Sequence, residues 1–64
     1  MLNNIRKFRY SCCLNIFELA ERTNISYSYL SALENGIKEN PTYDVIVKLL
    51  KYFNCSFEDL FPQG

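Results

Sequence analysis

Apolar residues recur along this chain at the three- and four-residue spacing that is typical of amphipathic helices. The first segment with this spacing covers residues 2–11, where Leu2, Ile5 and Phe8 are separated by polar and basic residues. The pattern predicts an amphipathic helix in this segment, which Asn3 or Asn4 can cap, and similar segments follow it along the rest of the chain.

The stretch from residue 15 to residue 35 has the pattern of two short helices joined by a tight turn. Asn15 is a favourable N-cap, and Glu18 three residues later can bond the backbone N–H of Asn15, which would complete a capping box. Asn24 tolerates the left-handed conformation that follows many helices. We therefore expect a helix over residues 16–23 and a sharp turn after it.

The second helix of this stretch is bounded by Ser26, a favourable N-cap, and by Gly36, a strong stop signal. Its predicted buried stripe consists of Tyr29, Leu30 and Leu33. The residues left on its outer side are Tyr27, Ser28, Ser31 and Ala32. Two short helices with so tight a connection indicate a helix-turn-helix.

Two more helices are predicted after this motif. Thr42 caps the first, which should end at Asn54, and Ser56 with Asp59 gives a cap signal for the second. The expected buried face of the longer helix contains Tyr43, Ile46, Leu49, Leu50 and Phe53. The pattern as a whole predicts an all-α, compact five-helix bundle, with the helix-turn-helix at helices 2 and 3 and residues 1–64 in a single domain.

Composition and charge restrict the classes of function. The chain has 64 residues, 48% of them hydrophobic, and its seven Lys and Arg balance seven Asp and Glu. A neutral chain has no overall field that attracts polyanions, so a binding function has to rest on a local surface. No apolar run approaches the ~20 residues of a membrane span, and we recognise no signal peptide. We therefore expect a cytoplasmic protein with no membrane partner.

The three cysteines, two of them adjacent, match neither a zinc site nor a disulfide framework, and the chain has no histidine. We expect Cys12, Cys13 and Cys55 to be reduced thiols, and a redox switch through Cys12 or Cys13 is the alternative. We expect no metal and no cofactor. An enzyme is not expected either, because histidine, paired carboxylates and a phosphate-binding loop are all missing from the pattern.

The order of the motifs resembles the Cro and phage-repressor family of helix-turn-helix domains, also called XRE-like. The residues that carry the resemblance, without a gap, include Glu18-Leu19-Ala20, Ile25-Ser26, Glu34-Asn35-Gly36, Asn40-Pro41-Thr42 and Ser56 to Phe61. The resemblance implies a five-helix fold of the phage-repressor DNA-binding type. It also implies a structural ion pair between Arg9 and Glu34. The implied function is a sequence-specific transcriptional regulator, expected to be a repressor, that binds operator DNA as a homodimer with helix 3 in the major groove.

The resemblance also implies a set of DNA contacts. Contacts with the DNA backbone are implied for Asn15, Asn35 and Lys38. Contacts with base edges are implied for Tyr27, Ser28 and Ser31. Ile16 stands where the family commonly has a glutamine and makes no hydrogen bond through its side chain, and Ala32 can contact only a thymine methyl group.

Two alternatives follow from the apolar residues. We predict a dimer interface at Tyr52, Phe57, Leu60 and Phe61, because a small core has little room to cover them; closure of the monomer core is the competing interpretation. An exposed patch of Ile16 and Phe17 beside Tyr27 would suit a protein partner instead of DNA. A protein-interaction or antitoxin-like module on the same fold is therefore the alternative function.

Overall fold

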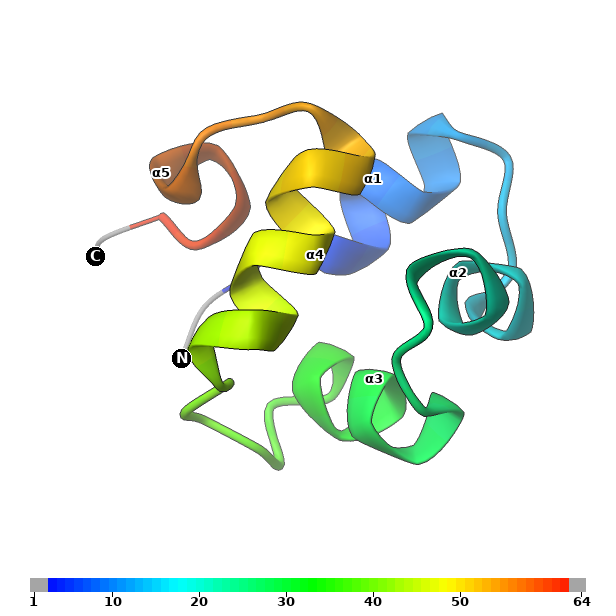
Figure 1. Ribbon diagram of the computed structural model, residues 1–64, viewed down its shortest axis with the longest axis horizontal. Coiled ribbons are helices and arrows are strands. Elements are labelled where there is room, and N and C mark those ends of the chain that lie inside the picture. The colour runs from blue at the N-terminus through cyan, green and yellow to red at the C-terminus, as the bar shows by residue number, and fades with distance from the viewer. Residues whose placement is uncertain (1–2, 63–64) are drawn as a thin grey trace.

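The computed structural model describes residues 3–62, which form five helices and contain no strand. The helices are α1 (Ile5–Ser11), α2 (Ile16–Thr23), α3 (Tyr27–Glu34), α4 (Tyr43–Phe53) and α5 (Phe57–Leu60). α4 lies at the centre of the molecule, with α5 on one side and α2 and α3 on the other (Figure 1). The predicted all-α, five-helix fold is confirmed for this part of the chain. Within residues 3–62, no helix combines the length and apolar character that a membrane span requires.

α1 begins at Ile5, directly after Asn4, which is one of its two expected caps. The Asn4 side chain makes no cap bond; its backbone N–H donates to the carbonyl oxygen of Leu60 at 2.8 Å, and the Asn3 Oδ1 accepts from the backbone N–H of Ile5 at 3.2 Å. Leu2, expected in this helix, lies outside the described residues. Of the predicted apolar positions, Ile5 is fully buried and Phe8 is half-buried.

The predicted N-caps are confirmed. The side chains that accept a hydrogen bond from the third residue of their helix are those of Asn15, Ser26, Thr42 and Ser56. At α2 the capping box is complete, since the Asn15 Oδ1 accepts from the backbone N–H of Glu18 at 2.8 Å and the Glu18 Oε1 accepts from that of Asn15 at 2.9 Å. These short-range bonds set where each helix begins.

Four helices end in the same way, with a backbone N–H bonded to the carbonyl five residues earlier. The bonds are Leu14 to Arg9, Ile25 to Ala20, Ile37 to Ala32 and Cys55 to Leu50. Each is preceded by a residue with positive φ, and these are Cys13 at 57°, Asn24 at 58°, Gly36 at 74° and Asn54 at 54°. Glycine and asparagine are the usual residues for this conformation, so Cys13 is the exception.

We expect Cys13→Asn to raise the free energy of unfolding by about 0.5 to 1 kcal/mol, a part of the ~1–2 kcal/mol that a left-handed conformation costs most residues. Thermal and urea unfolding followed by circular dichroism measure the change. Cys12→Asn is the matched control, because Cys12 is also exposed but has a φ of −92° and gains nothing from asparagine. Equal shifts in both variants would contradict this explanation.

One hydrophobic core joins all five helices and their connections. Its buried members are Ile5, Leu14, Leu19, Ile25, Leu30, Leu33, Val45, Leu49, Leu60 and Phe61. The expected buried face of α4 is wrong at one position: Tyr43 is 82% exposed. As the first residue of the helix, Tyr43 precedes the turn that faces the core, and Val45 is buried two residues later.

The predicted dimer interface is wrong for two of its four residues. Leu60 and Phe61 are 0% and 1% exposed, so they lie in the core of their own chain and cannot form a surface. The reason is that α5 is bonded to the start of α1 through Asn4, which turns its apolar side inward. Phe57 is 37% exposed and Tyr52 is half-buried, and an interface through these two side chains stays a prediction.

Candidate nucleic-acid interface

α2 and α3 pack against each other and present their first turns at the surface (Figure 1). The turn between them contains Asn24, whose left-handed conformation redirects the chain, and Ile25, which is buried beneath the turn. Ser26 then starts α3 through its side-chain cap. This arrangement is the expected helix-turn-helix, and it fixes α3 against the core through Leu30 and Leu33.

The outer side of α3 carries the residues that were expected to meet bases. Tyr27 is 44% exposed and Ser28 is exposed, whereas Ser31 and Ala32 are half-buried. Their polar groups are two serine hydroxyls and one phenol, which both donate and accept hydrogen bonds. The surface therefore has hydrogen-bonding capacity but no charge of its own at these four positions.

An aromatic pair joins the first turns of the two helices. The ring of Phe17 on α2 stacks on that of Tyr27 on α3, with centroids 4.4 Å apart and planes 5° from parallel. Phe17 is 63% exposed and was not among the expected DNA contacts. The adjacent Ile16 is half-buried and packs against the core, so it contributes less surface than its neighbour. The apolar run Ile16-Phe17 was the signal in the sequence for this patch.

The two asparagines expected to contact the DNA backbone already make hydrogen bonds within the protein. Asn15 completes the cap of α2, as described above. Asn35 donates from Nδ2 to the carbonyl oxygen of Ser31 at 2.9 Å, and its Oδ1 accepts from Nη2 of Arg6 at 3.0 Å. Arg6 on α1 thus reaches the end of α3, while its side chain stays 51% exposed.

The Arg9 side chain connects α1 to α3. Its Nε and Nη2 donate to the two carboxylate oxygens of Glu34, each at 2.9 Å, and its Nη1 donates to the carbonyl oxygen of Leu14 at 3.0 Å. The side chains of Arg9 and Glu34 are only 9% and 1% exposed. The hydrogen bonding of Arg9 to the Glu34 carboxylate raises the pKa of Arg9, so the guanidinium stays charged. The bridge positions α3 relative to the rest of the bundle.

Lys38 lies just beyond α3 and is exposed. Its ammonium group is 4.9 Å from the ring centroid of Tyr29, whose Oη accepts from the backbone N–H of Thr42 at 2.9 Å. Tyr29 is half-buried and packs on the core, in line with its predicted place in the buried stripe. The contact with Tyr29 holds the Lys38 cation beside the end of α3, where a phosphate contact was expected.

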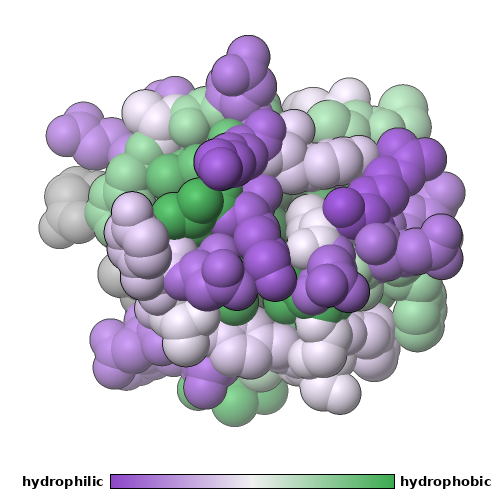
Figure 2. All heavy atoms as spheres, viewed as in Figure 1, coloured by the Kyte–Doolittle hydropathy of each residue, from purple (hydrophilic) through white to green (hydrophobic). Residues whose placement is uncertain are grey.

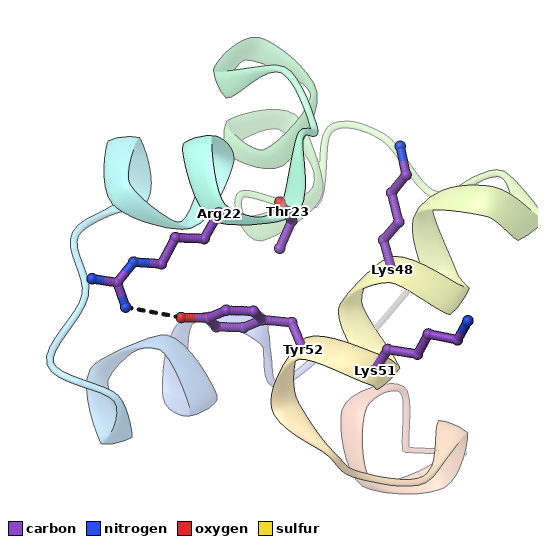
Figure 3. Close-up of a pocket in the computed structure, with 5 residues that line it drawn as sticks. All are labelled: Arg22, Thr23, Lys48, Lys51 and Tyr52. Atoms are coloured by element: carbon purple, nitrogen blue, oxygen red, sulfur yellow. Dashed lines mark hydrogen bonds between the residues drawn. The ribbon is translucent and has the colours of Figure 1, made fainter.

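A shallow pocket of about 320 Å³ lies between the end of α2 and the second half of α4. It is lined by Arg22, Thr23, Lys48, Lys51 and Tyr52 (Figure 3). The charged ends diverge in the close-up, since the Arg22 Nη1 donates to Tyr52 Oη at 3.2 Å while the two lysines point elsewhere. The pocket therefore does not gather its cations around a common point. Hydrophilic side chains cover much of the face of the molecule that Figure 2 shows.

The cysteines lie outside the surface formed by α2 and α3. Cys12 and Cys13 are exposed free thiols at the end of α1, and Cys55 is half-buried after α4. Burial, and secondly the negative charge of Asp59, raise the pKa of the Cys55 thiol. Redox chemistry at Cys12 or Cys13 stays a hypothesis. Among residues 3–62 no cluster of three or more possible metal ligands occurs.

Comparison with known proteins adds a family to this geometry. A family model described as helix-turn-helix matches residues 15–60. The sequence is 42% identical over 48 residues to an uncharacterized HTH-type transcriptional regulator of Rickettsia conorii. The matched stretch is 70% of this chain and 44% of that protein. A similarly described protein of Rickettsia prowazekii is 38% identical over 48 residues, which is 70% of this chain and 52% of that protein. The chain thus spans about half the length of the curated relatives it matches.

Proposed function

The chain belongs to the helix-turn-helix family, and from this premise we propose that it is a sequence-specific DNA-binding transcriptional regulator, acting as a repressor from the cytoplasm. In this proposal residues 1–64 are one domain that binds and does not catalyse, and α3 lies in the major groove of operator DNA. The observation that carries it is the pair of capped first turns, on α2 and α3, that reach the surface side by side.

Helix ends support phosphate binding on this surface. The first turns of α2 and α3 present backbone N–H groups and partial positive charge, which attract phosphates without a basic side chain. The proposed contacts with the DNA backbone are Asn15, Asn35 and Lys38, with Ile16 packing beside them. The proposed contacts with base edges are Tyr27, Ser28, Ser31 and Ala32. Arg6, bonded to Asn35 and Glu34, brings a second basic side chain to the end of α3.

We expect a defined duplex to be enriched when the protein selects DNA from a random pool, and Ser28→Ala to raise its Kd about tenfold. The Ser28 side chain is exposed, and loss of a single hydrogen bond to a base costs ~0.5–1.5 kcal/mol, of which the upper end is about tenfold in Kd. A mobility-shift titration with the selected duplex measures the change. Ser11→Ala is the matched control, because Ser11 is an exposed helical serine on α1 that bonds the carbonyl of Lys7 within its own helix. The two serine variants should bind differently.

The same selection tests the proposed homodimer. Two copies related by a two-fold axis would place their α3 helices in successive major grooves, about 34 Å apart. The enriched sequences should then contain two inverted half-sites with that separation. A single, non-palindromic site would contradict the homodimer and leave the DNA-binding proposal standing.

A protein-interaction module is the second candidate. It is favoured by the uncharged outer side of α3 and by the exposed ring of Phe17, which is 63% accessible. Side chains that bond bases through two hydrogen bonds, such as arginine and glutamine, do not occur at positions 27, 28, 31 and 32. If no duplex is enriched at micromolar protein concentration, sequence-specific DNA binding is excluded and the protein-interaction module is the better candidate.

A further inference from the structure

We infer that the Phe17–Tyr27 stack reads the C5-methyl groups of thymines in the operator, and that Phe17 is a specificity-determining residue. The inference rests on the proposed DNA-binding function, since it concerns the chemistry of the base edges that α2 and α3 meet. Neither residue belongs to the buried core, and the two rings are the aromatic surface at the first turns of the helix-turn-helix.

The geometry of the pair suits a rigid contact. The rings are nearly parallel at 5° and their centroids are 4.4 Å apart, so each restricts the rotation of the other. Phe17 and Tyr27 nevertheless remain 63% and 44% exposed. A pre-ordered aromatic surface loses little side-chain entropy when a partner covers it. The stack is thus an exposed apolar feature that is already fixed in position.

The base edges in the major groove determine which chemical group the Phe17 ring can contact favourably. Thymine presents a methyl group there, and the other base edges present hydrogen-bond donors and acceptors. Phe17 has no polar atom and cannot satisfy those donors or acceptors, so an apolar group is its favourable neighbour. A phosphate is disfavoured for the same reason.

The test compares thymine with uracil, which differ only by the C5-methyl group. The duplex that the wild-type protein selects from a random pool is synthesised with thymidine or with 2′-deoxyuridine in its half-sites. We expect the uracil duplex to bind at least about fourfold more weakly, the effect of removing one buried methyl group from a contact. Competition titrations in a mobility-shift assay measure this ratio directly.

Substitutions of Phe17 test whether its ring causes the weaker binding of the uracil duplex. In Phe17→Ala and in Phe17→Gln, the Kd for the uracil duplex divided by the Kd for the thymine duplex should fall close to one. Tyr10→Ala is the control, because Tyr10 is 64% exposed, almost the same as Phe17, but lies on α1 outside the stack. In Tyr10→Ala this ratio of Kd values should remain that of the wild-type protein. Circular dichroism confirms folding of each variant, and Phe17→Gln serves if the alanine variant is unfolded.

Each outcome has a distinct meaning. A wild-type ratio of at least about fourfold that disappears in the Phe17 variants supports the inference. A selected duplex that binds equally well with uracil overturns it, as does a ratio that the Phe17 variants leave unchanged, and in both cases the proposed DNA-binding function stands. Failure to select any duplex overturns the proposed function and the inference with it.

Discussion

Glu34→Ala is expected to lower the free energy of unfolding by about 3 to 5 kcal/mol, because it leaves the charged Arg9 guanidinium buried without its carboxylate. Glu34 accepts two hydrogen bonds from Arg9 at 2.9 Å and one from Arg6 at 3.2 Å, and its side chain is 1% exposed. A chain of 64 residues has a total stability of roughly 3 to 10 kcal/mol, so the variant should lose a large fraction of its stability.

Urea unfolding followed by circular dichroism measures this loss, and an exposed pair provides the control. Asp44 and Lys48 form an ion pair at 3.1 Å with side chains 75% and 35% exposed, so Asp44→Ala should cost less than about 1 kcal/mol. Combining Glu34→Leu with Arg9→Met should recover much of the stability, because no buried charge is left unpaired. Similar losses for Glu34→Ala and Asp44→Ala would show that the buried bridge does not hold α3.

Phe61→Ala is the second substitution with a large expected effect. The ring is 1% exposed and contacts the rest of the core, so its removal leaves a cavity and should cost about 3 to 5 kcal/mol. Urea unfolding at two protein concentrations checks both the size of the loss and its origin. For a core residue the midpoint does not depend on protein concentration.

Phe57→Ala is the control for this substitution. Phe57 lies in the same short helix and its ring centroid is 5.2 Å from that of Phe61, but it is 37% exposed. Removal of the Phe57 ring should lower the free energy of unfolding by less than half as much as Phe61→Ala does, because less buried apolar surface is lost. If Phe61→Ala instead yields a folded monomer from a dimeric wild type, Phe61 belongs to a subunit interface and the core assignment is wrong.

The boundaries of the helices could be predicted well, because their causes lie within a few residues of one another. Local hydrogen bonds explain the capping box of Asn15 with Glu18 and the cap at Ser26. Local backbone sterics explain the left-handed residue Asn24. Cys13 escaped prediction because its residue type does not favour the conformation that the chain gives it. The family resemblance came from the same local motifs.

Contacts between segments that are far apart in the chain could not be predicted from local motifs. Periodicity showed that Leu60 and Phe61 are apolar but not whether another copy or their own core covers them. The bond between Asn4 and Leu60 answers that question, and it joins residues 56 positions apart. The same bond ties the start of α1, directly after the cap residue Asn4, to the far end of the chain.

The binding surface shows the same division. Spacing along α3 was enough to place Tyr27 and Ser28 outward, because the period of a helix is local. Stacking of Phe17 on Tyr27, and the bond from Arg6 to Asn35, depend on how α1, α2 and α3 pack. Local hydrogen bonds and periodicity thus specify the helices and the turn, whereas the partners of exposed side chains follow from packing between segments that are far apart in the chain.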